Sequence, residues 1–482
     1  NHKVEGLILL NHGIFTFGNS AKQSYDRMIN LVTLAENFLN KQKKSIKYNN
    51  NNKQINITDV QLCIRNLYHS FTDKRWIIKF NDKIEDVKFT NRKDLFNLFN
   101  KGPVTPDHVI RIKSEPLIIP NKHLSLSKMI SNHIDAYIKK YKNYFKKYKK
   151  NITNSKIADP LPRIIILEGI GFLSIGLNKK EMQVSYDIFD AMKKVIIKAN
   201  LVSKFKSINN TDIFKMEYWP LERAKLNNQN TKKFNGNVAV ITGGAGKIGS
   251  AIANKFINEN IEVILLDKNF KNLDINIKKK CLCIECDLTN NSQINKALNK
   301  ILKLFGGIDI LIANSGAAFQ GSMLNVKKDI LEKSLEVNFY SHHNIVQKIA
   351  NIMVSQGFGG SISLNLSKQS INPGKDFGPY GIAKASSLFS MKQYALEFGK
   401  YNIRVNGINA DRIKSGLLTD QFIKERAKAR NMSSTEYLNN NLLQKQVTAE
   451  DVAEAFFAQL SFEKTTGNII TVDGGNIEAS LR

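Results

Sequence analysis

Cysteine is scarce in this sequence, with four residues among 482. Cys63 stands alone, whereas Cys281, Cys283 and Cys286 share one apolar run. That run has no second cysteine cluster and no nearby histidine, so its spacing does not complete a zinc site. We expect reduced thiols, with Cys281 and Cys283 on one face of a strand and Cys286 on the other. The scarcity excludes a disulfide framework and favours a cytoplasmic protein.

Long hydrophobic runs are absent as well. The longest apolar stretch, Ile164–Leu177, is interrupted by Glu168 and three glycines and is too short to span a bilayer. The chain starts at Asn1 without the basic and apolar segments of a signal peptide. We therefore expect a fragment or a processed chain with no membrane partner. Its 482 residues, 42% of them hydrophobic, predict two or three domains.

Acidic residues are few beside basic ones, 42 against 71, and the net charge is +29. Residues 1–234 carry +22 of it and residues 235–482 only +7. A basic half can indicate nucleic acid or an anionic surface as the partner. However, the densest basic segment, Lys139–Lys150, overlaps a tyrosine stripe at helical spacing. Its members are Tyr137, Tyr141, Tyr144 and Tyr148. We predict a helix docked by its tyrosines rather than a stacking platform for bases, and no nucleic-acid partner.

Two asparagine-rich stretches, Lys47–Gln54 and Leu226–Gly236, are typical of exposed linkers. They divide the chain into residues 1–45, 46–234 and 235–482, and no internal repeat is visible. The last part alternates apolar, β-branched runs with amphipathic helical patterns. This alternation predicts an α/β fold with a doubly wound parallel sheet of the Rossmann type.

The expected strands of residues 235–482 are Val238–Thr242, Glu262–Asp267, Leu282–Asp287, Ile308–Asn314, Ser361–Ser367, Ile403–Asn409 and Asn468–Val472. The expected helices between them are Ile248–Glu259, Ser292–Phe305, Asp329–Gln356 and Tyr380–Lys400.

The first strand runs into a glycine-rich turn, Thr242–Gly249, and then a helix. Glycines there let the backbone approach a pyrophosphate, which the free N–H groups of the helix N-terminus bind. Asp267 ends the next strand, where a carboxylate accepts hydrogen bonds from a ribose and repels a 2′-phosphate. The combination predicts a dinucleotide site that prefers NAD to NADP. A solvated loop carboxylate is the alternative for Asp267.

Tyr380 and Lys384 are spaced i, i+4 at the start of a predicted helix, so they share one face. A nearby ammonium favours the phenolate form of a tyrosine, whose reference pKa is about 10. Such a pair can exchange a proton with an alcohol or carbonyl oxygen while a hydride passes to or from nicotinamide. Alone, this spacing is common and indicates nothing.

Together these motifs resemble, in order and spacing, the short-chain dehydrogenase/reductase family over residues 235–482. The motifs are Thr242–Gly249, Asn314-Ser315-Gly316, Asn338, Ser367, Tyr380 with Lys384, Arg404-Val405-Asn406 and Val472-Asp473-Gly474-Gly475. The resemblance implies that Tyr380 is the general acid–base and that Lys384 lowers its pKa and binds the nicotinamide ribose. It implies that Ser367 holds the substrate oxygen and that Asn338, unless it only bridges helix and strand, supports a proton relay.

The same resemblance implies the residues that bind the cofactor, with Asp287 near the adenine. They are Thr242, Gly243, Gly246, Ile248, Gly249, Asp267, Asp287, Asn314, Gly316, Tyr380 and Lys384. Members of the family often form dimers or tetramers, so we expect a homo-oligomer. Three departures from the family pattern put local contacts in doubt: Lys247 replaces the usual second glycine, Ser315 a common alanine, and Ala410-Asp411 the usual Pro-Gly.

The N-terminal part reads as a buried strand over Gly6–Gly13 that ends in a His–Gly turn, is continued by Ile14–Gly18 and is followed by a helix over Ala21–Leu39. It resembles the C-terminal end of class II, zinc-dependent sugar-phosphate aldolases, an α/β fold in which a histidine placed like His12 is one of three zinc ligands. No H-x-H motif is present, and catalytic zinc takes about three protein ligands. His12 alone cannot bind it, so zinc is expected only if upstream sequence supplies the other ligands. A structural histidine is the alternative.

The middle region reads as mixed α/β, with a strand, turn and strand over Arg163–Leu177. Asp107 and His108, in Thr105–His108, serve as a helix cap or turn more readily than as catalytic groups. The order of the parts, with the motifs Thr105–Ile112 and Met216–Trp219, resembles the bifunctional rhamnulose-1-phosphate aldolase/alcohol dehydrogenase family.

That resemblance implies a lactaldehyde-type hydroxy-aldehyde or alcohol as the small-molecule substrate. We therefore predict an NAD-dependent oxidoreductase. A zinc aldolase in the complete protein is the alternative, and a basic binding protein is a third, weaker one.

Overall fold

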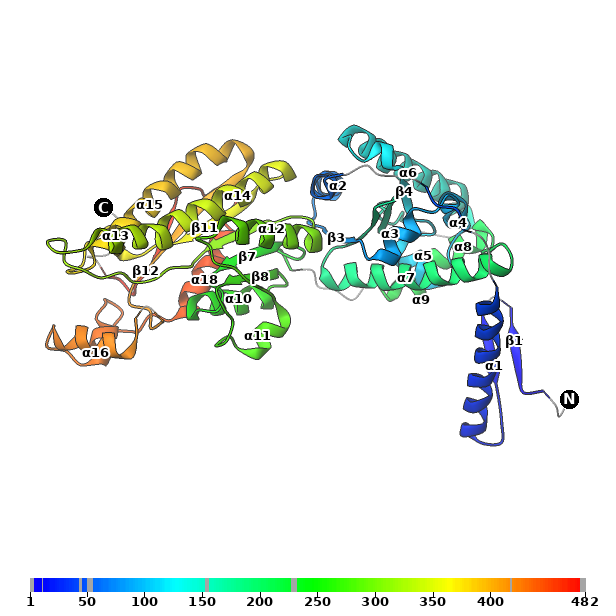
Figure 1. The fold of residues 1–482 in the computed structure, drawn as a ribbon, viewed down its shortest axis with the longest axis horizontal. Coiled ribbons are helices and arrows are strands. Elements are labelled where there is room, and N and C mark those ends of the chain that lie inside the picture. The colour runs from blue at the N-terminus through cyan, green and yellow to red at the C-terminus, as the bar shows by residue number, and fades with distance from the viewer. Residues whose placement is uncertain are drawn as a thin grey trace.

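The computed structural model describes residues 4–10, 12–42, 46–49, 55–151, 156–226, 232–416 and 418–476. Figure 1 shows three parts in chain order: an N-terminal hairpin with one helix, a middle α/β part and a C-terminal α/β part. The hairpin and its helix project from the far end of the middle part, away from the C-terminal part. No helix within the described ranges is both long and apolar enough to cross a membrane.

The C-terminal part is built on a seven-stranded parallel sheet, which confirms the predicted doubly wound fold. The strand order β13-β12-β11-β10-β7-β8-β9 starts near the centre and winds outwards in one direction and then the other. The strands are β7 (Val238–Thr242), β8 (Glu262–Asp267), β9 (Leu282–Glu285), β10 (Ile310–Ala313), β11 (Gly360–Asn365), β12 (Ile403–Ala410) and β13 (Ile469–Val472). All seven lie within two residues of the predicted ends.

Helices cover both faces of this sheet because its strands are apolar on both sides (Figure 1). One face is covered by α12 (Asn291–Phe305), α14 (Ser341–Gln356) and α15 (Gly378–Phe398), and the other by α10 (Lys247–Asn258), α11 (Ile275–Lys280) and α18 (Ala449–Leu460). The two short helices α16 (Asp420–Lys428) and α17 (Ser434–Asn439) follow β12. Cys286 packs into the first core, whereas Cys281 and Cys283 pack against the second. This confirms their predicted placement on opposite faces, and all four cysteines are free thiols.

One predicted helix is interrupted. The pattern over Asp329–Gln356 forms α13 (Lys328–Leu335), a π turn (Glu336–Tyr340) and then α14. A π turn adds one residue to the helical repeat and is common at functional sites. Here it contains Asn338, which is fully buried.

The middle part has a four-stranded mixed sheet in the order β3-β6-β5-β4. The strands are β3 (Ile77–Asn81), β4 (Leu117–Ile119), β5 (Ile164–Leu167) and β6 (Gly171–Gly176). Antiparallel pairing of β5 with β6 confirms the predicted strand, turn and strand. The helices are α2 (Ile57–Thr72), α3 (Ile84–Thr90), α4 (Leu95–Phe99), α5 (Pro106–Ile112), α6 (Ser127–Tyr148), α7 (Lys179–Val202), α8 (Asn210–Glu217) and α9 (Pro220–Ala224).

The tyrosine stripe lies on α6 as predicted. Tyr141 is buried and bonds through its hydroxyl to Glu217 and Tyr218, while Tyr144 and Tyr148 pack against the ring of Phe214. The lysines of the helix are exposed. The basic segment is therefore the solvated face of a docked helix.

The prediction of a buried strand over Gly6–Gly13 is wrong. β1 (Gly6–Leu9) turns at His12 and pairs antiparallel with β2 (Gly13–Thr16), so the chain reverses instead of continuing. Ile8 is 78% exposed, and the following helix α1 (Ala21–Lys41), predicted correctly, has no buried residue. An apolar run predicts a strand, but it does not specify which element covers that strand.

The predicted linkers lie partly outside the described residues, at 50–54 and 227–231. The remainder of the first is not a free loop, because Tyr48 forms a β-bridge with Arg92 and Asn49 donates a hydrogen bond to Glu168. Between the middle and C-terminal parts, Arg65 of α2 forms a buried ion pair with Asp309, which directly precedes β10. This contact joins the two parts through buried charges.

Candidate active site

The glycine-rich turn after β7 contains positions at which a side chain would clash with the neighbouring backbone. Gly243 has φ +62°, and a Cβ there would lie 2.9 Å from the Cα of Ser315. A Cβ on Gly249 would approach the carbonyl oxygen of Gly243 to 2.2 Å. Gly246 caps the N-terminus of α10. The turn therefore leaves room for a ligand beside the free N–H groups of the helix.

Polar side chains join the ends of three neighbouring strands. Thr242 Oγ1 accepts hydrogen bonds from the backbone N–H groups of Asn314 and Ser315, at 2.9 and 3.1 Å. Asn314 donates through Nδ2 to the Thr242 carbonyl at 3.1 Å, and Asn365 donates to Asn314 Oδ1 at 2.8 Å. The network fixes the carboxyl ends of β7, β10 and β11 relative to one another.

Two carboxylates follow β8 and β9. Asp267 accepts hydrogen bonds from the backbone N–H of Ala245 in the glycine turn, at 2.9 Å, and from that of Lys268, at 2.7 Å. Asp287 accepts from Thr289 and forms an ion pair with Lys268 at 2.9 Å. The pKa of Asp287 is lowered, because these hydrogen bonds and the ammonium outweigh partial burial, which would raise it.

A cavity of about 670 Å³ runs along these strand ends. Its lining includes Gly243, Gly246, Ile248, Asp267, Asp287, Asn314 and Gly316, seven of the residues predicted to bind the cofactor. Lys247 lies on the same wall, exposed in the first turn of α10. Room for an extended ligand and the N-terminus of a helix therefore occur together, as a dinucleotide requires.

Tyr380, Ser367 and Lys384 come together beside this cavity. Tyr380 is buried in the first turn of α15, and its hydroxyl is close enough to the side chain of Ser367 for that side chain to lower its pKa. Lys384 Nζ lies 5.8 Å from the Tyr380 ring centre and donates to the carbonyl of Asn365, a cavity residue, at 2.9 Å.

Burial shifts the pKa values of both Tyr380 and Lys384. Burial raises the pKa of Tyr380 to about 12, and the side chain of Ser367 opposes the shift. Burial also lowers the pKa of Lys384 to about 8. Burial therefore has the largest effect on the pKa of each group, because it disfavours both the phenolate and the ammonium.

The side chain of Asn338 is directed at the turn after β10. Its Oδ1 accepts from the N–H of Ala317 and its Nδ2 donates to the carbonyls of Ala317 and Ser334, all between 3.0 and 3.2 Å. The backbone carbonyl of Asn338 accepts from Ser387 Oγ at 3.0 Å. Asn338 thus holds the cavity wall at Gly316, where an added Cβ would lie 2.9 Å from its Oδ1.

His342 was missed in the sequence analysis. It is buried one turn after Asn338, and its Nε2 donates to the Ser315 carbonyl at 2.7 Å. Its Nδ1 is buried without a partner among the described residues. Burial and the nearby Lys384 lower the pKa of His342 to about 3, so the ring is neutral. The departure of Ser315 from the usual alanine was the available signal, since the Ser315 hydroxyl lies 3.1 Å from the same nitrogen.

The Ala410-Asp411 departure has a structural explanation. Asp411 accepts hydrogen bonds from Lys368 at 3.1 Å and from Asn476 at 2.8 Å. Lys368 follows Ser367 directly, so this carboxylate connects the loop after β12 to the segment that carries the predicted catalytic serine.

The remaining candidates lie far from this site in the chain. His12 is exposed at the hairpin turn, and the described residues contain no cluster of three His, Cys, Asp or Glu side chains that could hold a metal. Thr105 and His108 form a capping box at the start of α5, with the Thr105 N–H donating to His108 Nδ1 at 2.8 Å. This confirms the capping interpretation for His108.

Two family models match the chain. Residues 56–226 match the model described as "Aldolase class II, second domain", and residues 243–476 the model described as "Enoyl-(Acyl carrier protein) reductase". The uncharacterized oxidoreductase YuxG of Bacillus subtilis is 27% identical over 98% of this chain and 73% of its own.

Two further matches cover about half of the chain. Short-chain dehydrogenase reductase 3a of Arabidopsis thaliana is 27% identical over 50% of this chain and 96% of its own. A solved short-chain dehydrogenase/reductase from Mycobacterium marinum is 24% identical, with a TM-score of 0.46, and covers 50% of this chain and 95% of its own. The C-terminal half of this chain is similar to oxidoreductases of the short-chain dehydrogenase/reductase family, and residues 56–226 are similar to the second domain of class II aldolases.

Proposed function

We propose that this chain is an NAD-dependent dehydrogenase in which Ser367, Tyr380 and Lys384 act on a small hydroxy-aldehyde or alcohol. The observation that carries the proposal is the grouping of Tyr380 with Ser367 and Lys384, because Lys384 donates to the carbonyl of Asn365, which lines the cavity along the strand ends. Buried tyrosine and lysine side chains, close together next to a cleft, are typical of acid–base sites.

Each side chain has a role that follows from its contacts. Tyr380 donates its proton to a carbonyl oxygen in reduction and accepts one from an alcohol in oxidation. Ser367, close to the Tyr380 hydroxyl, orients the same substrate oxygen. A charged Lys384 stabilises the phenolate electrostatically and donates to a ribose hydroxyl at the cavity wall. The nicotinamide, when bound, supplies or accepts the hydride.

The cavity fits a dinucleotide, and the residues proposed to hold it are those of the glycine turn and the strand ends. The turn N–H groups and the N-terminus of α10 bind the pyrophosphate, and Asn314 and Gly316 lie towards the nicotinamide. The carboxylate of Asp267 favours NAD, because it accepts hydrogen bonds from a ribose and repels a 2′-phosphate. Its neighbour Lys268 is already paired with Asp287.

The proposed substrate class is lactaldehyde-type, and the proposed state in solution is a homo-oligomer without nucleic acid or membrane. A second candidate function, a zinc-dependent sugar-phosphate lyase, is favoured only by the match of residues 56–226 to the second domain of class II aldolases. Zinc-dependent cleavage of rhamnulose 1-phosphate by the purified chain would support that candidate, and its absence would contradict it for this chain.

NADH oxidation with lactaldehyde, and NAD reduction with a panel of small polyols and sugars, test the proposal. Tyr380→Phe is expected to lower kcat by about 10²- to 10⁴-fold, the usual contribution of a general acid–base, with NADH binding retained. Tyr394→Phe is the matched control, because Tyr394 is also buried on α15 but bonds to His343. Equal loss in both variants, or no turnover and no NADH binding by the parent chain, would contradict the proposal.

A further inference from the structure

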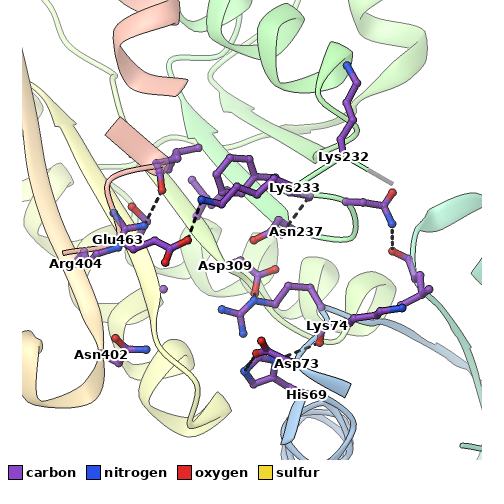
Figure 2. A pocket seen from close by; sticks show the side chains of 18 of the residues that line it. His69, Asp73, Lys74, Lys232, Lys233, Asn237, Asp309, Asn402, Arg404 and Glu463 are labelled. Carbon is purple, nitrogen blue, oxygen red and sulfur yellow. Dashed lines mark hydrogen bonds and ion pairs between the residues drawn. The ribbon is translucent and has the colours of Figure 1, made fainter. Parts of the chain in front are cut away.

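A second cavity, of about 680 Å³, lies at the opposite edge of the seven-stranded sheet (Figure 2). Its floor is formed by the amino ends of parallel strands, at Ile310 of β10, Ser361 of β11 and Arg404 of β12. Its walls come from the turn between α2 and β3, from residues 232–237 and from the segment after α18. We call it the junction pocket, since it lies between the middle and C-terminal parts.

The lining of the junction pocket is rich in cations. Six basic side chains line it: Lys74, Arg75, Lys232, Lys233, Arg404 and Lys464. Only three carboxylates accompany them: Asp73, Asp309 and Glu463. The short-chain dehydrogenase site at the other edge uses none of these residues.

Two of the three carboxylates are already engaged. Asp309 is buried and accepts hydrogen bonds from Arg65, at 2.7 and 3.2 Å, and from the N–H of Val238, at 2.8 Å. Glu463 pairs with Lys233 at 2.9 Å. Asp73 is exposed and lies 3.8 Å from Nε2 of His69, whose pKa is lowered by burial and by Arg75. The three carboxylates therefore do not neutralise the six basic side chains that line the pocket.

Arg75 is a cation of this pocket with a buried, unsatisfied hydrogen-bond donor. Its Nε lies 3.7 Å from the engaged Asp309, its guanidinium stacks 4.2 Å from the Phe358 ring centre, and its Nη1 is buried with no hydrogen-bond partner in the described ranges. Burial lowers the pKa of Arg75, although arginine remains charged. An unpaired buried guanidinium N–H loses its water without compensation.

Three further cations of the pocket have no carboxylate partner in the part of the chain that the structure describes. Arg404 donates to the carbonyls of Leu460 and Phe462 at the end of α18, at 3.1 and 3.0 Å. Neither Arg404, Lys74 nor Lys464 has a carboxylate within ion-pair distance among the residues described. Lys232 is different, because it bonds to the Asn258 carbonyl and to Glu259 outside the pocket.

We propose that the junction pocket binds a phosphate-type anion, free or as the monoester of a small metabolite, with Arg75 as the main donor and Lys74 and Lys464 at the rim. The planar guanidinium offers its unpaired N–H to a phosphate oxygen, and such charge-assisted bonds are the strong ones. The volume exceeds that of one phosphate, so an organic group has room beside it. Because both parts of the chain line the pocket, the anion stabilises their junction.

Binding of inorganic phosphate and of glycerol 1-phosphate to the full chain tests the proposal. The readouts are calorimetric affinity and thermal stabilisation, measured at constant ionic strength with chloride as the balancing salt. We expect Arg75→Gln to weaken phosphate binding by about tenfold or more, as loss of a charge-assisted hydrogen bond does. The exposed double variant Lys74→Gln/Lys464→Gln leaves the buried ion pairs intact, and we expect it to weaken binding about threefold.

Lys247→Gln is the matched control, because Lys247 lines the dinucleotide cavity at the other sheet edge. Full phosphate binding in this control, with losses in the junction variants, supports the proposal. Loss of binding in Lys247→Gln instead would place the anion in the dinucleotide cavity and overturn it. Equal binding in every variant, or no binding of either probe at millimolar concentration, would overturn it as well. If Arg75→Gln fails to fold, the double lysine variant alone decides between these outcomes.

Discussion

The two edges of the seven-stranded sheet carry cavities of similar volume, about 670 and 680 Å³, that are built in different ways. At the carboxyl edge, much of the wall consists of short motifs that end or follow a strand: a glycine turn, an aspartate and an Asn-Ser-Gly turn. At the amino edge, the walls come from three segments far apart in the chain, and the polar groups are mostly charged.

This difference follows from how parallel sheets are connected. The loops after the strands gather at one edge, so local sequence there specifies a ligand site. The loops before the strands gather at the other edge, where this chain brings a second part of the protein against the sheet through Arg65 and Asp309. Ligand chemistry at the carboxyl edge is therefore local, whereas at the amino edge it depends on how two parts of the chain meet.

Among the variants that test this comparison, Asp309→Asn is expected to have the largest effect, a loss of stability. The variant leaves the buried guanidinium of Arg65 without its ion pair, and breaking a buried pair typically costs about 3–5 kcal/mol. We expect the unfolding free energy to fall by about 3 kcal/mol, measured as a shift of the urea midpoint. The control, Asp329→Asn, alters an exposed carboxylate 3.7 Å from Lys333 and should change stability by less than about 0.5 kcal/mol. A similar small change for Asp309→Asn would show that the amino edge does not depend on this pair.

Gly249→Ala should affect the carboxyl edge alone. The new Cβ would approach the Gly243 carbonyl oxygen to 2.2 Å, so the turn must move away from the position that cradles the pyrophosphate. We expect NADH affinity, followed by fluorescence, to fall about 10- to 100-fold, which corresponds to about 1–3 kcal/mol of strain. Gly399→Ala is the control, because a Cβ at Gly399 meets nothing within 4 Å. Unchanged NADH affinity in Gly249→Ala would mean that the dinucleotide does not use this turn.

Much of the carboxyl edge could be predicted from the sequence, because buried parallel strands are apolar runs and the polar motifs follow them directly. All seven strands could be predicted in this way. The shared face of Tyr380 and Lys384 followed from their spacing on a helix, whereas Ser367 was grouped with them only through the family resemblance. The N-terminal hairpin could not, since an apolar run such as Gly6–Leu9 does not reveal whether anything covers it. The π turn at Asn338 and the contact of His342 with Ser315 could not be predicted either, because both arise from packing between helix and sheet. The junction pocket joins residues separated by hundreds of positions, for which a single sequence holds no signal.

Asp267→Asn sharpens the comparison, because it removes a negative charge at the carboxyl edge and keeps the size of the side chain. Asp267 already binds the N–H groups of Ala245 and Lys268, so the amide is expected to keep part of that contact. Removing the negative charge removes repulsion of a 2′-phosphate, while Lys247 on the same wall attracts it. We expect the ratio of NADPH to NADH affinity to rise by about tenfold. An unchanged ratio would place the adenosine ribose away from Asp267 and remove the basis for the proposed NAD preference.

The smallest effect is expected at His342, beneath the floor of the carboxyl-edge cavity. Its pKa is about 3 in the folded chain and about 6.5 in an unfolded one, because burial and Lys384 disfavour the imidazolium. Between these values the unfolded state binds more protons, so stability falls as the pH drops below about 6.5.

His342→Gln keeps a donor for the Ser315 carbonyl but does not titrate, and should therefore lose this part of the acid sensitivity. Between about pH 7.5 and pH 6, the wild type is expected to lose about 1 kcal/mol more unfolding free energy than the variant, measured from urea midpoints. The control, His343→Gln, removes a histidine that bonds to Tyr394 instead. If wild type and His342→Gln showed the same pH dependence, the ring would be open to water, and the Ser315 turn would be held by the strand-end network of Thr242 and Asn314 alone.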